Sequence, residues 1–234
     1  MPFGVKVLKA VAPRLLRPAM PPVEVHASLL AKNDSAAARN RALFAAKRLL
    51  ALNLVSSPGA GKTTLLARTV DEFEERCAAI VGDLATDNDA RRLRRPHVPV
   101  AQITTGAACH LDAEMVARGV AALDLAGVRV LFIENVGNLV CPAAFDLGEA
   151  VRVVLLSVAE GEDKPLKYPP IFKSAQLVLL TKIDAAAALG FDCVAAADNI
   201  RRIAPQAQLI RLSARSGEGL DEWYRFLRAH LPPR

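Results

Sequence analysis

The sequence predicts an α/β fold in which a mostly parallel β-sheet is flanked by helices. From residue 51 onward, short apolar runs alternate with segments of helical length, which is typical of β-α-β units in a sheet covered on both faces. Hydrophobic residues make up 52% of the 234 residues and charged residues 23%, a composition that excludes a disordered or fibrous chain. The length fits one domain with at most a short appendage.

The runs that we interpret as buried strands are Leu52–Val55, Ala78–Val81, Val98–Ile103, Val128–Ile133, Val151–Val158, Leu177–Leu180 and Gln208–Leu212. Helices are expected between most of them, over residues 62–76, 112–125, 190–203 and 219–230. Ahead of the first strand, residues 22–49 lack Gly and are rich in Ala, Leu, Arg and Lys, which predicts a long N-terminal helix. Its polar middle, Asn33–Ser35, is the place where this helix could break.

The excess of positive charge lies at the front of the chain. Residues 1–50 hold nine Lys and Arg and two Asp and Glu, whereas the remaining 184 residues are close to neutral. The formal net charge of +6 therefore does not describe a nucleic-acid-binding domain, and aromatic residues that could stack on bases are limited to Phe3 and Phe44 in this segment. We interpret residues 1–21 as a basic, poorly ordered N-terminal extension.

The cysteine count and the lengths of the apolar runs indicate the cellular compartment in which the protein is expected. Four cysteines are too few for a disulfide framework in a chain of this length. No apolar run reaches the roughly 20 residues needed to span a bilayer, and Pro13 and Pro18 interrupt the start of the chain before a signal-peptide core could form. We therefore expect a cytoplasmic protein with free thiols and with neither a membrane nor a nucleic-acid partner.

A glycine-rich loop follows the first expected strand and opens a helix. Residues 56–64 read Ser-Ser-Pro-Gly-Ala-Gly-Lys-Thr-Thr, close to the phosphate-loop pattern G-x-x-x-x-G-K-[ST] with Ser56 in place of the first Gly. Bare N–H groups and a helix N-terminus suit a triphosphate, Lys62 would reach its β- and γ-phosphates, and the Thr63 hydroxyl would bind Mg²⁺. The nucleotide-binding residues expected here are Gly59, Ala60, Gly61, Lys62, Thr63 and Thr64. This context predicts a P-loop NTPase fold.

Two later loops indicate which base is bound. The sixth expected strand is followed by Thr181-Lys182-Ile183-Asp184, which resembles the N-K-x-D guanine signature of GTPases with Thr in place of Asn. The Asp184 carboxylate could accept both N1–H and N2–H of guanine, a donor pair that adenine lacks, and Lys182 could lie along the base. Ser213 and Ala214 follow the last strand, where GTPases carry the loop that backs the base. We therefore expect GTP and GDP, with a solvated turn as the alternative explanation for the Lys–Asp pair.

Carboxylates after two neighbouring strands are the expected Mg²⁺ ligands beside Thr63. Glu134 follows the fourth expected strand and precedes Gly137, whose N–H could face a γ-phosphate, and Asp83 follows the second expected strand. With Lys62, these groups form the expected catalytic set, although each carboxylate could instead cap the helix that follows. No residue is placed to orient an attacking water, so we expect slow GTP hydrolysis.

Two cysteines and a histidine are candidate metal ligands. Cys109-His110 stands just before Asp112, a suitable N-cap for the following helix, and Cys141 lies seven residues beyond Glu134. Two thiolates and an imidazole suit Ni²⁺, Zn²⁺ or Cu⁺ and leave a coordination position open, unless two chains share the site. The spacing is not of the C-x-x-C type. On spacing alone, two buried free cysteines and a histidine at the start of a helix are the simpler explanation.

Five stretches of the sequence occur together in one known family. They are residues 30–41, the Ser-Ser-Pro-Gly loop 56–59, Cys109–Asp112, Glu134–Pro142 and Glu160–Pro169. From Glu24 onward the chain therefore resembles the HypB family of hydrogenase nickel-incorporation GTPases, and residues 22–234 would form its GTPase domain. The resemblance implies a homodimer when GTP is bound, with Ni²⁺ or Zn²⁺ at Cys109, His110 and Cys141. It also implies nickel delivery to a hydrogenase large-subunit precursor, together with a small zinc-containing nickel chaperone.

Two features depart from the family pattern. The first cysteine is Cys77 and the only histidine before residue 97 is His26, so neither an N-terminal Cys-rich nickel motif nor a His-rich storage tract is present. Thr181 is the second departure, and it bears on the strength of guanine selection. The alternative functions are a GTPase chaperone of the urease or cobalamin-enzyme type and a GTP-regulated interaction protein without a metal role.

The linear order of the candidate residues predicts coupling between nucleotide and metal. Cys141 lies four residues beyond Gly137, which is expected to face the γ-phosphate. A γ-phosphate that repositions this loop would move a metal ligand, so nucleotide state and metal affinity should depend on each other.

Overall fold

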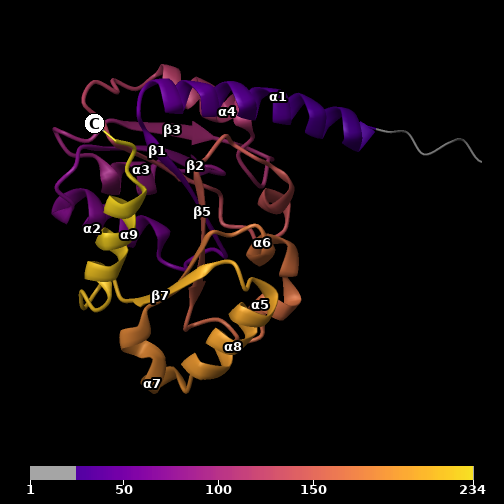
Figure 1. Ribbon diagram of the computed structural model, residues 1–234, viewed down its shortest axis with the longest axis vertical. Helices are drawn as coiled ribbons and strands as arrows, with labels where there is room; N and C mark the ends of the chain where they lie inside the picture. The colour runs from indigo at the N-terminus through magenta and orange to yellow at the C-terminus, as the bar shows by residue number, and fades with distance from the viewer. Residues whose placement is uncertain (1–24, 234) are drawn as a thin grey trace, which may run out of the picture.

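The computed structural model of the chain describes residues 25–233, which form a seven-stranded parallel β-sheet with helices on both faces (Figure 1). The strands are β1 (Leu50–Ser56), β2 (Cys77–Asp83), β3 (Val100–Thr104), β4 (Val130–Glu134), β5 (Val151–Ser157), β6 (Leu177–Thr181) and β7 (Gln208–Leu212). Their order is β3-β2-β4-β1-β5-β6-β7, and every neighbouring pair is parallel. The predicted fold class is confirmed, and the carboxyl ends of all seven strands lie at one edge of the sheet.

Helices precede, connect and follow these strands on either side of the sheet. They are α1 (Val25–Ala46), α2 (Lys62–Glu72), α3 (Asn88–Leu93), α4 (Ala113–Ala121), α5 (Lys164–Lys167), α6 (Pro169–Lys173), α7 (Ala186–Leu189), α8 (Cys193–Ile203) and α9 (Leu220–His230). Two 3₁₀ turns, η1 (Cys141–Ala144) and η2 (Ile183–Ala185), complete the regular structure of the described residues.

Neighbouring residues of β1 divide between the two faces of the sheet. Leu52 belongs to the core under α2 and α9, where the fully buried Trp223 donates from Nε1 to Thr69 Oγ1 at 2.9 Å. Ala51 and Val55 face the opposite side, which α1 and α4 cover over one half of the sheet and α6 and α8 over the other. Because both faces are covered, the strands are continuous apolar runs in the sequence.

The N-terminal helix is continuous through its polar middle. The break considered at Asn33–Ser35 does not occur, because Asn33 turns into the protein and its amide exchanges hydrogen bonds with Ala113 and Asp146. Figure 1 shows α1 lying alongside α4. The predicted extension, residues 1–21, lies outside the described residues.

Three predicted helices end earlier than expected. The N-terminal helix, predicted to reach residue 49, stops at Ala46. The helix predicted to reach residue 76 stops at Glu72, because Phe73 is extended and leads the chain into β2. The helix predicted over 112–125 begins after Asp112, whose carboxylate accepts from the N–H of Met115 at 2.7 Å. It ends at Ala121, and the residues that follow fold back onto the core of that face.

Several other predicted elements begin later than expected, among them the fourth strand, which starts at Val130 rather than Val128. The helix predicted from residue 190 starts at Cys193, because Gly190 adopts a left-handed conformation (φ 63°) that ends α7. The third strand starts at Val100 rather than Val98, since Val98 still pairs with Arg95 across a turn.

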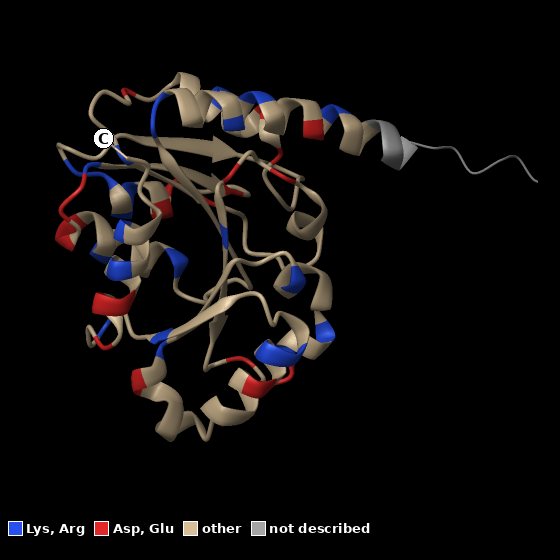
Figure 2. Cartoon of the chain, viewed as in Figure 1, with Lys and Arg blue, Asp and Glu red and all other residues tan. Residues whose placement is uncertain are grey.

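Charged residues of both signs are mixed over the surface. Figure 2 shows Lys and Arg beside Asp and Glu on the helices seen in that view. Within residues 25–233, no helix combines the length and the apolar composition needed to cross a membrane.

Candidate nucleotide and metal site

The glycine-rich loop joins β1 to α2 at the carboxyl edge of the sheet. Gly59 and Gly61 have φ of 74° and 100°, a region that residues with a side chain rarely adopt. The loop can therefore turn sharply, so that α2 begins at Lys62 beside a cavity of about 510 Å³ that Gly59–Thr64 line. Bare N–H groups and a helix N-terminus at a cavity favour phosphate binding.

Lys62 is a buried cation of this cavity. Its Nζ donates to Ser56 Oγ at 2.9 Å, and Ser56 Oγ donates to the carbonyl of Ser57 at 2.7 Å. Ser56, the residue that departs from the phosphate-loop pattern, is thus a partner of the lysine. Burial lowers the pKa of the Lys62 ammonium, which the nearby Glu134 partly opposes. A buried ammonium at a cavity favours an anionic ligand.

Glu134, at the end of β4, is the buried acid of the same cavity. Its Oε1 accepts from Thr63 Oγ1 at 2.7 Å. Burial raises the pKa of the Glu134 carboxyl to about 7, whereas Lys62 and the Thr63 hydroxyl act in the opposite direction. Its Oε2 is buried without a hydrogen-bond partner in the part of the chain that the structure describes. This unpaired oxygen, together with a hydroxyl and the Asp83 carboxylate of the same cavity, fits the oxygen ligands of Mg²⁺.

Asp83 lies at the end of β2 and lines the cavity. Its Oδ1 accepts from the N–H groups of Thr86 and Ala85 at 2.7 and 2.9 Å, and these bonds, Thr86 first, hold the pKa of the carboxyl below its ordinary value. It does not cap the next helix, because α3 begins at Asn88 with Asp87 as its N-cap residue. Asp83 is therefore held as a carboxylate at the cavity.

Two further charged residues of the cavity belong to no recognised motif. Asp89 and Arg92, on α3, both line it, with Arg92 Nη1 3.7 Å from Asp89 Oδ1. Arg92 Nη2 also donates to Thr64 Oγ1 at 3.0 Å. The signal in the sequence is their three-residue spacing on a short helix, which is equally that of an ordinary surface ion pair.

A second cavity, of about 270 Å³, shares Ala60, Gly61, Thr64 and Lys182 with the first. The residues of the two predicted base loops that line it are Thr181, Lys182, Asp184, Ser213 and Ala214. Thr181 Oγ1 donates to the carbonyl of Ala60 at 2.7 Å, and Lys182, at φ 61°, donates from Nζ to the carbonyl of Gly59 at 2.7 Å. Both residues therefore hold the phosphate loop, while Asp184 is exposed at the cavity.

Cys109, His110 and Cys141 form one cluster. Their ligand atoms all lie within 4.8 Å of one another, and over residues 25–233 they are the one group of Cys, His or acidic side chains found with the spacing of a metal site. The two sulfur atoms are 2.8 Å apart, and Cys109 Sγ lies 3.8 Å from His110 Nδ1. Cys77 and Cys193 do not belong to the cluster.

The surroundings of the cluster shift the pKa values of Cys109 and His110. The hydrogen bond with Cys141 raises the pKa of the Cys109 thiol, and burial adds to this effect. Burial lowers the pKa of His110 although Asp112 opposes it, so the imidazole favours its neutral, metal-binding form. The His110 ring lies against Phe145, with centroids 4.0 Å apart. Two soft sulfur atoms and a neutral imidazole suit Ni²⁺ or Zn²⁺.

One loop connects the nucleotide cavity to the cluster. It runs from Glu134 in the cavity to Cys141 in the cluster. Midway, Gly137 packs so closely on a proline of the phosphate loop that a Cβ would fall 2.9 Å from the proline Cα. Asn138 Nδ2 then donates to the carbonyl of Cys109 at 3.3 Å. The loop therefore touches both the phosphate loop and the segment that carries Cys109.

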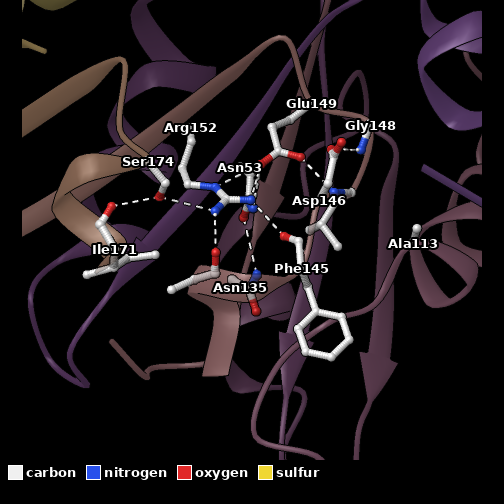
Figure 3. A network of polar contacts seen from close by, with 12 residues as sticks. Asn53, Ala113, Asn135, Phe145, Asp146, Gly148, Glu149, Arg152, Ile171 and Ser174 are labelled. Atoms are coloured by element: carbon white, nitrogen blue, oxygen red, sulfur yellow. Dashed lines mark hydrogen bonds and ion pairs between the residues drawn. The ribbon is translucent and has the colours of Figure 1, made fainter. Parts of the chain in front are cut away.

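A buried polar network supports the segment that follows Cys141 (Figure 3). Arg152, on β5, donates from Nε and Nη2 to Glu149 Oε1 at 2.9 and 2.7 Å, and the two side chains are only 8% and 6% exposed. Arg152 also donates from Nη2 to the carbonyl of Phe145 at 2.7 Å and from Nη1 to that of Ala143 at 3.4 Å. The guanidinium thus fixes the backbone just beyond the second cysteine.

Two asparagines extend the network to the segment that carries Cys109 and His110. Asn53 Nδ2 donates to Glu149 Oε1 at 3.1 Å, and Asn135 Nδ2 donates to Asn53 Oδ1 at 3.2 Å (Figure 3). Asn135 Oδ1 accepts from the N–H of Leu111, directly after His110, at 3.0 Å. The segment that carries Cys109 and His110 and the segment that carries Cys141 are therefore both attached to the central strands.

The stretch 160–169 borders the same region of the molecule. Lys164 and Tyr168 line a hollow of about 290 Å³ together with Gly137 and Val140. Val140, next to the second cysteine, is 63% exposed. The cluster thus lies beside a hollow of mixed polar and apolar lining and an exposed valine.

Known proteins are similar to this chain over most of its length. The family described as CobW/HypB/UreG, nucleotide-binding domain, matches residues 50–211. The hydrogenase maturation factor HypB of Azotobacter vinelandii is 54% identical over 223 residues, which cover 94% of this chain and 73% of that protein. HypB of Escherichia coli K12 is 52% identical over 210 residues, covering 88% and 71%. The crystal structure of HypB from Helicobacter pylori in complex with nickel is 37% identical, with a TM-score of 0.80 over 86% of this chain and 98% of that one.

Proposed function

Because the chain belongs to the HypB family of hydrogenase maturation factors, we propose that it is a GTP-binding metallochaperone that hydrolyses GTP slowly and delivers Ni²⁺ to a hydrogenase large-subunit precursor. The nickel is cargo, bound at Cys109, His110 and Cys141. The observation that carries the proposal is the loop from Glu134 to Cys141, which places a buried carboxylate of the nucleotide cavity and a sulfur of the cluster on one short segment.

The nucleotide side of the mechanism uses charges that the fold holds in place. The N–H groups of Gly59–Gly61 and the start of α2 would bind the phosphates, and the Lys62 ammonium would contact the β- and γ-phosphates. Thr63, Asp83 and Glu134 would hold Mg²⁺, which when bound neutralises charge on those phosphates. We propose slow hydrolysis because the recognised motifs include no residue that orients the attacking water.

The metal side of the mechanism uses the cluster as a transfer site. Two thiolates and a neutral imidazole would bind Ni²⁺ and leave a coordination position for a second copy of the chain or for the receiving protein. The solved HypB of Helicobacter pylori is described as a complex with nickel, which supports this cargo. Zn²⁺ accepts the same ligands and is the alternative.

Nucleotide state would control the metal through the shared loop. Gly137 packs on the phosphate loop, so a γ-phosphate that displaces it would also displace Cys141 and change nickel affinity. The exposed Val140 and the hollow beside Lys164 and Tyr168 offer a surface for the GTP-dependent homodimer. We place the protein in the cytoplasm, with a small zinc-containing nickel chaperone as a further partner.

The coupling is tested by titrating Ni²⁺ into the protein bound to GDP and into the protein bound to a non-hydrolysable GTP analogue. We expect different nickel affinities, and the same factor should appear in reverse when nucleotide is titrated with and without nickel. Equal affinities in the two nucleotide states would refute the coupling.

The assignment of the cluster is tested by Cys141→Ala, with Cys193→Ala as the matched control. The first change should weaken nickel binding at least tenfold and leave GDP affinity unchanged, because the sulfur is a ligand of the metal and not of the nucleotide. The second should match the wild type. A wild-type protein that takes up neither Ni²⁺ nor Zn²⁺ in stoichiometric amount would instead favour a GTP-regulated interaction protein.

A further inference from the structure

Two buried asparagines on α1 face the segments that carry the metal cluster. Asn33 and Asn40 are 6% and 3% exposed. They are seven residues apart, or about two helical turns, and therefore lie on the same face of α1. Neither contacts the nucleotide cavity or the cluster itself.

Each asparagine amide bridges the segment that follows His110 and the segment that follows Cys141. Asn33 Oδ1 accepts from the N–H of Ala113 at 2.9 Å while its Nδ2 donates to the carbonyl of Asp146 at 2.8 Å. Asn40 Nδ2 donates to the carbonyl of Ala113 at 2.8 Å and to that of Leu147 at 3.0 Å. Ala113, which follows His110 in the chain, is thus linked through α1 to two consecutive residues beyond Cys141, namely Asp146 and Leu147.

These attachment points lie close to the ligands in the chain. Ala113 is three residues beyond His110, and Asp146 is five residues beyond Cys141. Phe145, the residue before Asp146, packs its ring on the His110 ring. A shift of either attachment point therefore changes where the ligands stand relative to one another.

The contact between α1 and the segment that follows Cys141 is tight. Gly148 has φ of 87°, and a Cβ at this position would fall 2.6 Å from the carbonyl oxygen of Ala37 on α1. Arg41, also on α1, donates from Nη2 to both carboxylate oxygens of Asp146, at 2.9 and 2.7 Å. The helix is therefore seated on the backbone of this segment and cannot slide along it without breaking these contacts.

We infer that Asn33 and Asn40 are positioning residues of the nickel site, which hold the His110 segment and the Cys141 segment at the separation that the metal requires. The inference rests on the proposed function, in that nickel binds at the cluster. Groups that orient metal ligands without touching the metal commonly change its affinity by about 10- to 100-fold when they are removed.

The test compares Asn33→Ala and Asn40→Ala with the wild type and with Asn199→Ala. Asn199 is a matched control because it lies on α8 and donates from Nδ2 to a distant carbonyl, that of Glu162, at 3.0 Å. Ni²⁺ titration and the thiolate-to-nickel charge-transfer spectrum report on the cluster. GDP affinity and thermal unfolding report on the rest of the fold.

We expect nickel affinity to fall about 10- to 100-fold in Asn33→Ala and Asn40→Ala, with a changed charge-transfer spectrum and unchanged GDP affinity. Asn199→Ala should keep the wild-type affinity and spectrum. If Asn40→Ala does not fold, Asn33→Ala decides, because it leaves both bonds of Asn40 intact.

A folded Asn33→Ala protein with wild-type nickel affinity and spectrum would overturn the inference and leave the proposed function standing, whatever its melting temperature. A wild-type protein that binds no nickel would overturn the proposed function and, with it, the inference. The wild-type titration therefore distinguishes the two failures.

Discussion

The nucleotide cavity and the cysteine–histidine cluster differ in how the chain holds their functional groups. The phosphate-binding part of the cavity is one continuous segment, Gly59–Thr64, shaped by left-handed glycines and the start of a helix. The cluster combines Cys109 and Cys141, 32 residues apart, on two loops that buried amide and guanidinium groups from other elements hold in place. Local sequence thus determines the first site, whereas tertiary contacts determine the second.

This difference predicts which substitutions harm which site. A change in a supporting side chain should alter protein stability or metal binding and leave nucleotide binding largely intact. A change within the phosphate loop should weaken nucleotide binding and leave protein stability and metal binding largely intact. The following variants test that separation.

Arg152→Met should have the largest effect, because it removes one partner of a buried ion pair. Glu149, whose side chain is 6% exposed, would lose its two bonds to the guanidinium, and the carbonyls of Ala143 and Phe145 would lose a donor. Leaving a buried charge unpaired destabilises a protein by about 3–5 kcal/mol. Urea unfolding monitored by circular dichroism measures the free energy of unfolding.

Two controls sharpen this prediction. Arg201→Met removes an exposed pair with Asp198 and should change stability by less than about 1 kcal/mol. Adding Glu149→Gln to Arg152→Met should restore part of the loss, because the unpaired charge is gone. Equal stabilities of Arg152→Met and Arg201→Met would contradict a supporting role for the network.

Lys62→Ala should have the largest effect on the nucleotide. A buried ammonium that contacts phosphate contributes about 2–5 kcal/mol when it is truncated, so GDP affinity should fall roughly 30-fold or more. Nickel affinity without nucleotide should stay at the wild-type value, since Lys62 has no contact with the cluster. Fluorescent GDP titration measures the first effect, with the exposed Lys173→Ala as control. A parallel loss of nickel binding would show that the two sites are not held independently.

The same contrast explains what the sequence could predict. The seven apolar runs all became strands, because a parallel sheet covered on both faces makes each strand continuously apolar. The phosphate loop was predictable because its glycines, lysine and threonine act through local geometry. Helix ends were predicted less well, since Phe73 and Gly190 stop or delay helices through backbone conformations that apolar periodicity does not report.

The cluster and its supports could not be derived from spacing. Nothing in the order of residues 109–141 requires the two sulfur atoms to meet, and only the family resemblance pointed to a metal site. The polar middle Asn33–Ser35 was expected to be the place where the helix could break, because it interrupts the apolar pattern. The role of Asn33 depends on Ala113 and Asp146, which lie 80 and 113 residues away in the chain.

Asp184→Asn tests whether the second cavity selects guanine. A carboxylate can accept two N–H groups of guanine at once, whereas an amide offers one acceptor and adds donors. The preference for GTP over ATP should therefore fall by about 1–3 kcal/mol, or roughly 5- to 150-fold. Competition titrations with GDP and ADP measure it, with Asp198→Asn on the exposed face of α8 as control. An unchanged ratio of GDP to ADP affinity would show that Asp184 does not select the base and lies in a solvated turn, the alternative explanation for the Lys–Asp pair.

Thr181→Val should have the smallest effect, and it tests the comparison most directly. Thr181 ends β6 and begins the predicted base loop, yet its hydroxyl donates to the carbonyl of Ala60 across 121 residues, so the phosphate loop also has tertiary supports, among them this bond and the one from Lys182. Valine keeps the shape and removes the bond, which should weaken nucleotide binding by about 1 kcal/mol. GDP and ADP should weaken alike, because the lost bond is to the loop and not to the base. If the loss instead matched that of Lys62→Ala, the phosphate loop would depend on tertiary contacts as strongly as the cluster does.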